Sequence, residues 1–332
     1  MLASGRDEAA VEDRATGQTT TAPAIQVLSR RGDVSATLGC APWLIPWARF
    51  LPDRFFRQGV RAIDDLAGIA VARVADRLDR GIGGGRADLL RRLADARDEL
   101  GRPLGRHETE AEALTMLIAG SDTTSATLCA LVFWVLRTPG VLRDLQAELD
   151  AALPPNGDEG DSDGGGSGSA WAVPTYAAVR ELKYLRAVLN ETLRIHSTSS
   201  LGLPRVVPAG GATVCGQHFA PGTVLSVPAY TVHRAEDVWG HDAADFRPER
   251  WFTLTAAQRR SFVPFSTGPR GCVGQNVAEL QLLVVVATIF SGWHWAFAPA
   301  EAQGRPGAAL RTSEGFLRKP LGLVVAIKRR RA

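Results

Sequence analysis

The sequence has few cysteines, almost no net charge and no apolar leader, and each absence argues against a class of protein. The four cysteines lie far apart and form no Cys-x-x-Cys pair, which argues against a disulfide scaffold and against a clustered zinc or iron–sulfur site. The formal net charge is +3, from 38 Lys and Arg against 35 Asp and Glu, which is too small to indicate a nucleic-acid surface. Residues 1–24 are polar and of mixed charge, so we expect neither a signal peptide nor an amino-terminal anchor there.

What the chain does have is an ordinary globular composition with helical periodicity. Its 332 residues are 45% apolar and 22% charged, enough to bury a core in one large domain or two average ones. Apolar residues spaced by three and four predict a helix over 55–78, and a second helix is expected over 87–100. The fold class is therefore mainly α, with a small β portion late in the chain. The remaining expectations are strands over 213–216 and 224–227 joined by the turn at Pro221-Gly222, a final strand over 323–327, a solvated basic tail over 328–331 and a flexible Gly/Ser/Asp-rich loop over 154–170.

Two apolar stretches are long enough to cross a bilayer as helices. Residues 113–136 contain one charged side chain, Asp122, and residues 280–300 contain none. A protein with two membrane spans is therefore one alternative. Polar residues at the centre of the first stretch are costly to present to lipid, which favours helices buried in a large core.

The strongest local signal is a glycine-rich segment around one cysteine, FSTGPRGCVG over residues 265–274. Glycine lets a backbone pass close to a flat ligand, because no Cβ intervenes. A long apolar helix is expected directly afterwards, so Cys272 lies near the positive end of that helix, where a thiolate is stabilised. Arg270 can pair with an anionic group of the same ligand, and a soft thiolate suits iron. A lone cysteine is more often a buried structural residue, and only the complete pattern favours a ligand.

This segment resembles the haem-binding loop of the cytochrome P-450 monooxygenases. The resemblance implies that Cys272 is the axial thiolate ligand of a haem b iron. It covers nearly the whole chain from Pro23 to Arg330, apart from the loop at 154–170, and several segments look like the fungal benzoate para-hydroxylase branch. The loop residues that it assigns to cofactor binding, besides Cys272, are Phe265, Gly268, Arg270 and Gly274.

Residues 119–124, AGSDTT, match the family's oxygen-activation segment on a long central helix. Gly120 leaves space for a ligand against that helix, and Thr123 can bond back to the carbonyl of Ala119. Asp122 needs a partner in an apolar helix and is a natural relay for protons. The resemblance implies a cofactor contact at Gly120 and proton delivery by Asp122 and Thr123. The alternative is a polar kink in a core helix.

Two further motifs imply a buried network that braces the haem loop. Glu191 and Arg194 match the family's ExxR element, which is weak alone because residues 99–102 form a second copy in this chain. Residues 246–251, FRPERW, resemble the PERF element, with Trp251 where Phe is usual. By resemblance, the network consists of Glu191, Arg194 and Arg250. Ser197 departs from the family, since ExxR is commonly followed by a proline at this position.

Some assignments rest on fewer residues. Arg205 falls where many family members place a partner for a haem propionate. His233 precedes Trp239 in a familiar arrangement, and a satisfied core histidine is an equal alternative. The residues assigned to the substrate pocket are Leu201, Gly202 and Phe316.

The resemblance implies a monooxygenase that inserts one atom of dioxygen into a small aromatic substrate, with benzoate hydroxylated para to its carboxylate as the first choice. Thiolate ligation by Cys272 favours cleavage of the O–O bond. No dinucleotide or flavin fingerprint is present, so electrons are expected from NADPH-cytochrome P-450 reductase. The implied partners are that reductase, dioxygen and the aromatic substrate, with no nucleic acid.

The resemblance also bears on the extent of the chain. Family members carry a membrane anchor, several helices and most of a sheet before the point that corresponds to Met1. We therefore expect residues 1–332 to form a single partial domain, amino-terminally truncated, of a protein of the endoplasmic reticulum membrane. The alternatives are a non-catalytic remnant and a haem-thiolate isomerase or dehydratase, against which residues 122–124 argue.

Overall fold

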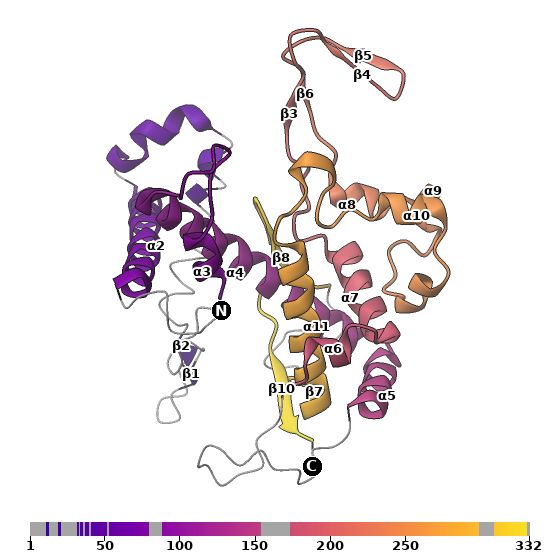
Figure 1. Ribbon diagram of the computed structural model, residues 1–332. Coiled ribbons are helices and arrows are strands. Elements are labelled where there is room, and N and C mark those ends of the chain that lie inside the picture. The colour runs from indigo at the N-terminus through magenta and orange to yellow at the C-terminus, as the bar shows by residue number, and fades with distance from the viewer. Residues whose placement is uncertain are drawn as a thin grey trace. The chain divides into compact units, whose positions relative to one another are not determined.

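Helices carry most of the described structure, and strands pair only in twos (Figure 1). The computed structural model describes residues 11–12, 19–20, 32, 34–35, 37–39, 41–51, 53–79, 88–153, 173–298 and 309–330. These residues divide into two compact units, 1–122 and 123–332. Helix α4 (Arg106–Arg137) contributes residues to both. The segment beginning at Pro23 and the predicted loop at 154–170 lie outside the described residues.

The first unit is built around one long amphipathic helix, α2. Its bounds confirm the helix predicted over 55–78, and its inner face packs with a small core formed by Val34, Leu38 and Ala48. The strands of this unit, β1 and β2, pair antiparallel. The elements are β1 (Val11–Glu12), β2 (Thr19–Thr20), the 3-10 helix η1 (Pro42–Phe50), α2 (Arg54–Asp79), α3 (Leu89–Ala94) and the first part of α4.

The second unit holds the main core, in which α7 and α11 pack together with α5 and the second half of α4. Every strand pair in its described residues is antiparallel. The helices are α5 (Val141–Ala152), α6 (Tyr176–Val179), α7 (Lys183–His196), α8 (Ala229–Val232), α9 (Glu236–Trp239), η2 (Pro248–Phe252), α10 (Ala256–Ser261), η3 (Gly268–Arg270) and α11 (Gln275–Gly292). The strands are β3 (Arg205–Val206), β4 (Ala212–Val214), β5 (Gln217–Phe219), β6 (Val224–Leu225), β7 (Trp293–Phe297), β8 (Thr312–Glu314), β9 (Arg318–Pro320) and β10 (Val325–Arg329).

The helix predicted over 87–100 is shorter than expected. Helix α3 ends at Ala94, and the chain then turns around the Asp98 carboxylate, which accepts backbone N–H bonds from Leu100 and Arg102 at 2.9 Å each. Gly101 has a φ of 76°, a left-handed conformation that a helix does not contain. The side chain of Asp98 therefore competes successfully with the helical backbone.

The strand pairing predicted around Pro221-Gly222 is wrong. Strand β4 ends at Val214 and pairs with β5, while β6 pairs with β3. The turn between β4 and β5 is Cys215-Gly216, where φ is 50° and 80°. Two successive positive φ values close a tight hairpin whose twist matches its strands.

The basic end of the chain is not a solvated tail over its described part. Lys328 and Arg329 belong to β10, which pairs with β7 and extends two residues past the predicted final strand. The guanidinium of Arg330 forms an ion pair with Asp150 of α5. These residues therefore hold the carboxyl-terminal strand onto the second unit.

The two apolar stretches of the sequence form α4 and α11, and both are long and apolar enough to cross a membrane by length and composition alone. In α11 the apolar face is buried in the main core through Leu282, Leu283, Val286 and Phe290. A buried core helix passes the same hydropathy test as a membrane span. The main core therefore accounts for the buried face of α11, while Val277, Leu280 and Val285 on the same helix are exposed.

Candidate functional site

The Cys272 loop is a tight glycine turn that leads directly into α11. The Cys272 N–H donates to the Phe265 carbonyl at 2.9 Å, which closes the loop on itself. Ser266 and Gly268 adopt φ values of 61° and 71°, and the 3-10 turn η3 (Gly268–Arg270) precedes Cys272. Gly274 is the amino-terminal cap of α11, two residues after Cys272. The loop therefore presents the thiol near the amino terminus of an apolar helix.

The geometry of this loop fits a flat, tetradentate metal cofactor. Cys272 is exposed, Val273 is fully exposed, and a Cβ placed on Gly268 would meet no other atom within 4 Å. Among the described residues, no group of three or more His, Cys, Asp or Glu side chains could hold a metal ion. A metal at Cys272 therefore needs most of its ligands from the cofactor itself, as the four nitrogens of a haem provide. The residues present fit haem, with Cys272 as the protein ligand.

The other loop residues assigned to the cofactor differ in their surroundings. Phe265 is half-buried and packs against the main core, while Arg270 is exposed at the end of η3. A Cβ placed on Gly274 would lie 3.8 Å from the Cys272 Sγ atom, which is ordinary contact distance. The loop is thus anchored by Phe265 and leaves the Arg270 guanidinium accessible to an anionic group.

Glu191 and Arg194 form a completely buried ion pair on α7. The Arg194 Nε and Nη2 atoms donate to the two carboxylate oxygens of Glu191 at 2.9 and 2.8 Å. The same guanidinium donates to the carbonyls of His233 and Ala243, both at 2.7 Å. Since a buried ion pair is stabilising only when its remaining donors are also satisfied, these bonds explain how the pair survives burial.

Arg250 joins this pair from η2, as the FRPERW motif indicated. Its Nε atom donates to Glu191 Oε1 at 2.9 Å, and its side chain is 2% exposed. Trp251 contributes what the usual Phe cannot, because its indole N–H donates to Glu191 Oε2 at 2.9 Å. Glu191, Arg194 and Arg250 thus form one buried network, and Trp251 is a fourth member that the sequence analysis singled out only as a departure.

The α4 residues of the oxygen-activation segment lie at the middle of that helix. Asp122 and Thr123 are half-buried, and Gly120 is exposed, with no atom within 4 Å of the position that a Cβ would take. The carbonyl of Thr123 accepts a bond from Thr127 Oγ1 at 2.9 Å, and that hydroxyl also lies 2.9 Å from Thr198 Oγ1. Thr127 therefore ties α4 to the segment after α7, a role that no motif signalled.

Thr123 on α4 and Cys272 in the loop before α11 belong to the same compact unit. Buried residues of α4, among them Leu131 and Val135, share the main hydrophobic cluster with Leu282, Val286 and Phe290 of α11. Gly120 and Asp122 are assigned to the first unit.

The residues assigned to the substrate pocket lie on two neighbouring segments. Leu201 and Phe316 are 57% and 63% exposed, so both present apolar surface. Phe316 lies in the turn between β8 and β9, and this hairpin is bonded to the segment after α7 through Arg318 N–H to the Thr198 carbonyl at 2.8 Å. Gly202 is packed instead, because a Cβ there would lie 2.6 Å from the Val227 carbonyl carbon.

Arg205, the residue assigned to a haem propionate, lies exposed in β3. Its Nη1 atom donates to the neighbouring Pro204 carbonyl at 2.9 Å. Such a bond leaves the other guanidinium donors available to an anion.

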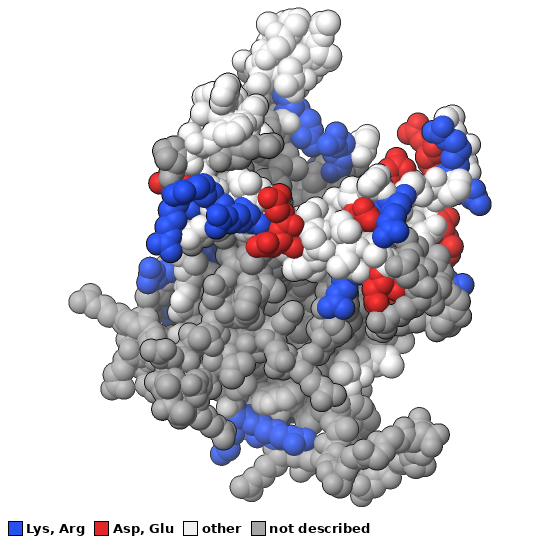
Figure 2. Space-filling view, turned by 90° about the vertical axis from the view of Figure 1, so that its left-hand side faces the viewer, with Lys and Arg blue, Asp and Glu red and all other residues white. Residues whose placement is uncertain are grey.

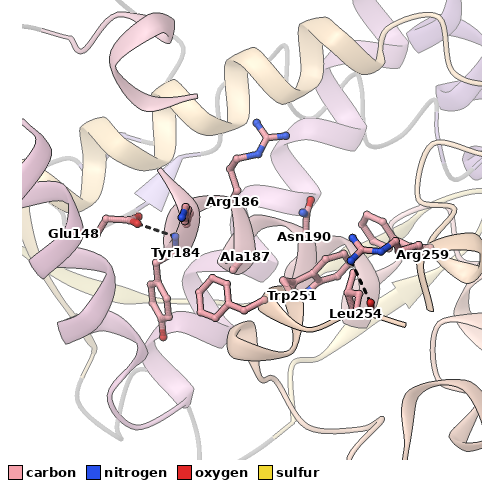
Figure 3. Close-up of a pocket in the computed structure, with 11 residues that line it drawn as sticks. Glu148, Tyr184, Arg186, Ala187, Asn190, Trp251, Leu254 and Arg259 are labelled. Atoms are coloured by element: carbon pink, nitrogen blue, oxygen red, sulfur yellow. Dashed lines mark hydrogen bonds between the residues drawn. The ribbon is translucent and has the colours of Figure 1, made fainter. Parts of the chain in front are cut away.

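A cavity of about 870 Å³ opens between α5, α7, η2 and α10. Figure 3 shows Tyr184, Ala187 and Asn190 of α7 lining it beside Trp251. Its edges are fixed by the Tyr184 N–H bond to Glu148 at 2.8 Å and by the Arg259 bond to the Leu254 carbonyl at 3.1 Å. None of the residues assigned to cofactor, substrate or proton delivery lines it.

Charges of both signs are interspersed on the described part of the face in Figure 2. Blue Lys and Arg side chains lie next to red Asp and Glu side chains at the middle of the view and on its right. This distribution agrees with the small net charge of +3 and offers no extended basic surface there.

Comparison with known proteins gives one consistent result. Residues 17–325 match the family model described as cytochrome P450. Benzoate 4-monooxygenase bphA of Aspergillus niger is 50% identical over a match that covers 99% of this chain and 61% of that protein. Cytochrome P450 67 of Uromyces fabae is 29% identical and matches 82% of this chain and 49% of its own length.

Solved structures agree in fold. The crystal structure of a cytochrome P450 named CYP102L1 has a TM-score of 0.72 and 24% identity, covering 95% of this chain and 66% of that one. The cytochrome P450DA heme domain has a TM-score of 0.71 and 25% identity, covering 94% and 62%. The chain thus spans about three fifths of the length of the Aspergillus relative that it matches. With its family model, its closed glycine loop around Cys272 and these likenesses, the chain belongs to the cytochrome P450 family.

Proposed function

We propose that this chain is the haem-thiolate portion of a monooxygenase that hydroxylates a small aromatic acid. The observation that carries the proposal is the exposed Cys272 thiol on a closed glycine loop, in a chain 50% identical to a benzoate 4-monooxygenase. We propose haem b as the cofactor. Bound haem iron with a thiolate ligand supplies the activation of dioxygen.

The residues of this chain hold the cofactor and handle protons. Cys272 Sγ ligates the iron, and Arg270 and Arg205 pair with the anionic groups of the macrocycle. Gly268 leaves room for its flat face, since its position has no atom near an added Cβ. The Asp122 carboxylate passes protons to the Thr123 hydroxyl, which delivers them at the site of oxygen reduction.

The substrate is proposed to be benzoate or a related aromatic acid. Leu201 and Phe316 supply apolar surface against an aromatic ring, while Gly202 allows the backbone after Leu201 to pack closely against Val227. Titration of the haem-supplemented protein with benzoate should give a low-to-high-spin shift of the Soret band, and benzamide, which lacks the charge, should bind more weakly. Equal shifts with both compounds would contradict an acid-specific site.

The first test is the carbon monoxide difference spectrum of the reduced, haem-supplemented protein. A strongly red-shifted Soret band is expected, and Cys272→Ala should abolish it because the thiolate ligand is lost. Cys215→Ala is the matched control, since Cys215 is also an exposed free thiol but lies in the turn after β4. Loss of the band in both variants, or in neither, would contradict ligation by Cys272, and no haem uptake would favour a non-catalytic remnant.

A second test addresses proton delivery. Thr123→Ala should uncouple oxygen consumption from product formation about tenfold or more, because a proton donor is removed from the reaction. Thr115→Ala is the control on the same helix, since the Thr115 hydroxyl bonds back to the Ala111 carbonyl. Product and oxygen consumption are measured together, and unchanged coupling in Thr123→Ala would contradict its role in proton delivery. Product formed without oxygen consumption would favour isomerisation or dehydration.

We also propose that electrons come from NADPH-cytochrome P-450 reductase and that the protein acts at the endoplasmic reticulum membrane. Both proposals rest on the family resemblance. Carbonate extraction of the expressed chain tests for α4 and α11 as membrane spans, because a spanning protein stays in the membrane pellet. Complete release would contradict the two-span alternative.

A further inference from the structure

His233 is completely buried at the end of α8 and is bonded through both ring nitrogens. The Val263 N–H donates to its Nε2 atom at 2.9 Å, so this nitrogen carries no hydrogen. The ring hydrogen therefore lies on Nδ1, which is 2.8 Å from Ser197 Oγ. The Ser197 hydroxyl in turn donates to the Arg194 carbonyl at 2.8 Å. These bonds run in one direction, from Val263 to Arg194.

One end of this chain of bonds is the entry to the Cys272 loop. Val263 lies two residues before Phe265, whose carbonyl accepts the Cys272 N–H. The Val263 carbonyl accepts the Ser266 N–H at 3.0 Å, which forms the first turn of the loop. Both backbone groups of Val263 are thus committed, one to the loop and one to His233.

The other end is the carboxyl terminus of α7. The Arg194 guanidinium donates to the His233 carbonyl at 2.7 Å, while the Arg194 carbonyl receives the Ser197 hydroxyl. His233 and Arg194 are therefore joined twice, through a backbone carbonyl on each. A closed set of bonds of this kind fixes the ring more firmly than a single contact does.

The surroundings keep the imidazole neutral, as the acceptor role requires. The ring lies among Trp239 and Phe262, with centroid distances of 6.5 and 5.6 Å. The charged groups that face it are the guanidinium groups of Arg194 and Arg234. Burial, followed by Arg194, lowers the pKa of His233 to about 4.

We propose that His233 and Ser197 are positioning residues for the axial thiolate: they anchor Val263, and so the start of the Cys272 loop, to the end of the helix that carries the buried Glu191–Arg194 pair. This inference deepens the proposed haem-thiolate function and rests on it. His233 acts through Val263 and touches no reacting group.

The test measures amide hydrogen exchange at Val263 in the 332-residue chain. His233→Leu removes the acceptor and should speed exchange there about tenfold relative to amides of α11. His233→Gln should restore most of the protection, because its amide oxygen can take the place of Nε2. His196→Leu is the matched control, since His196 is also buried near the end of α7 but bonds to the Arg318 carbonyl at 3.0 Å, away from the loop.

Equal exchange at Val263 in His233→Leu and His196→Leu would overturn the proposal. If His233→Leu does not fold, Ser197→Gly replaces it: glycine accepts the φ of 43° at this position and removes the hydroxyl. Faster exchange at Val263 is again expected, and wild-type protection would overturn the proposal.

A second measurement separates this inference from the proposed function. In haem-supplemented protein, His233→Leu should raise the fraction of the reduced carbon monoxide complex that lacks the thiolate band, and His233→Gln should lower it again. Failure of the wild-type chain to bind haem would contradict the proposed function while leaving the exchange result intact. Thiolate bands of equal fraction in all variants that bind haem would overturn the positioning role.

Discussion

Glu191 receives donors from four directions, and this explains why a short, common motif has a specific place here. Arg194, Arg250 and the Arg247 backbone N–H reach Oε1, and Arg194 and Trp251 reach Oε2. The other ExxR copy differs, because Arg102 bonds to Asp98 on the surface instead. Sequence spacing cannot separate the two copies, since burial and the partners from η2 are contributed by distant segments.

The role of Trp251 could not be predicted from the family pattern, in which Phe is usual at this position. We predict that Trp251→Phe lowers the free energy of unfolding by about 1.5–3 kcal/mol, because it removes a hydrogen bond to a buried carboxylate. Trp295→Phe is the matched control: its indole N–H donates to the neutral Ile289 carbonyl at 2.8 Å, so about 0.5–1.5 kcal/mol is expected. Urea denaturation of both variants measures the difference. An equal loss of unfolding free energy would show that the bond to Glu191 stabilises the fold no more than a bond to a neutral carbonyl.

At the scale of elements, periodicity predicted the long helices well and the short pieces poorly. Helix α2 follows from apolar spacing alone, because one face of a long helix must be buried. The early end of α3 depends on the Asp98 carboxylate, and the pairing of β4 with β5 depends on two positive φ values at Cys215-Gly216. In both cases a local hydrogen bond or backbone conformation decides where the element ends, and the spacing of apolar residues does not predict it.

Gly202 gives a prediction at this scale, because it holds the segment after α7 against the residues that follow β6. A Cβ at this position would contact Ser226 Oγ and lie 2.6 Å from the Val227 carbonyl carbon. Gly202→Ala should therefore cost about 1–3 kcal/mol of stability through overpacking against backbone. Gly210→Ala is the control, since nothing lies within 4 Å of its Cβ position.

Thermal unfolding of both glycine variants measures this effect. A similar melting temperature for Gly202→Ala and Gly210→Ala would show that the segment after α7 and residues 226–227 move apart to admit the methyl group without a loss of stability. Substrate binding in Gly202→Ala, measured by the benzoate-induced spectral shift, then tells whether the glycine also shapes the pocket.

At the scale of the whole molecule, the sequence predicted the family, the mainly helical fold and the residues of the buried network, because each rests on motifs with fixed spacing. It did not predict how the polar interior is satisfied. Ser197, His233 and Thr127 join segments 36 to 71 residues apart through hydrogen bonds within the second unit. Such bonds require the folded chain, since no local pattern brings their donors and acceptors together.

The same polar interior makes stability depend on pH. Burial, followed by Arg318, lowers the pKa of His196 to about 4, and burial, followed by Arg194, lowers the pKa of His233 to about 4. In the unfolded chain a histidine takes up its proton near a pH of about 6.5. The unfolded state therefore binds more protons between about pH 6.5 and pH 4, so stability is complete above this window and falls as the pH drops through it.

We predict that each histidine contributes up to about 1.4 kcal/mol per pH unit within that window. Urea denaturation at intervals from about pH 7.5 to about pH 4 measures the slope, and His233→Gln should reduce it because one titrating group is removed. A flat profile across this window would mean that both rings take up protons in the folded protein at the same pH as in the unfolded chain, so the one-way bonds from Val263 to Arg194 would hold the Cys272 loop only above about pH 6.5.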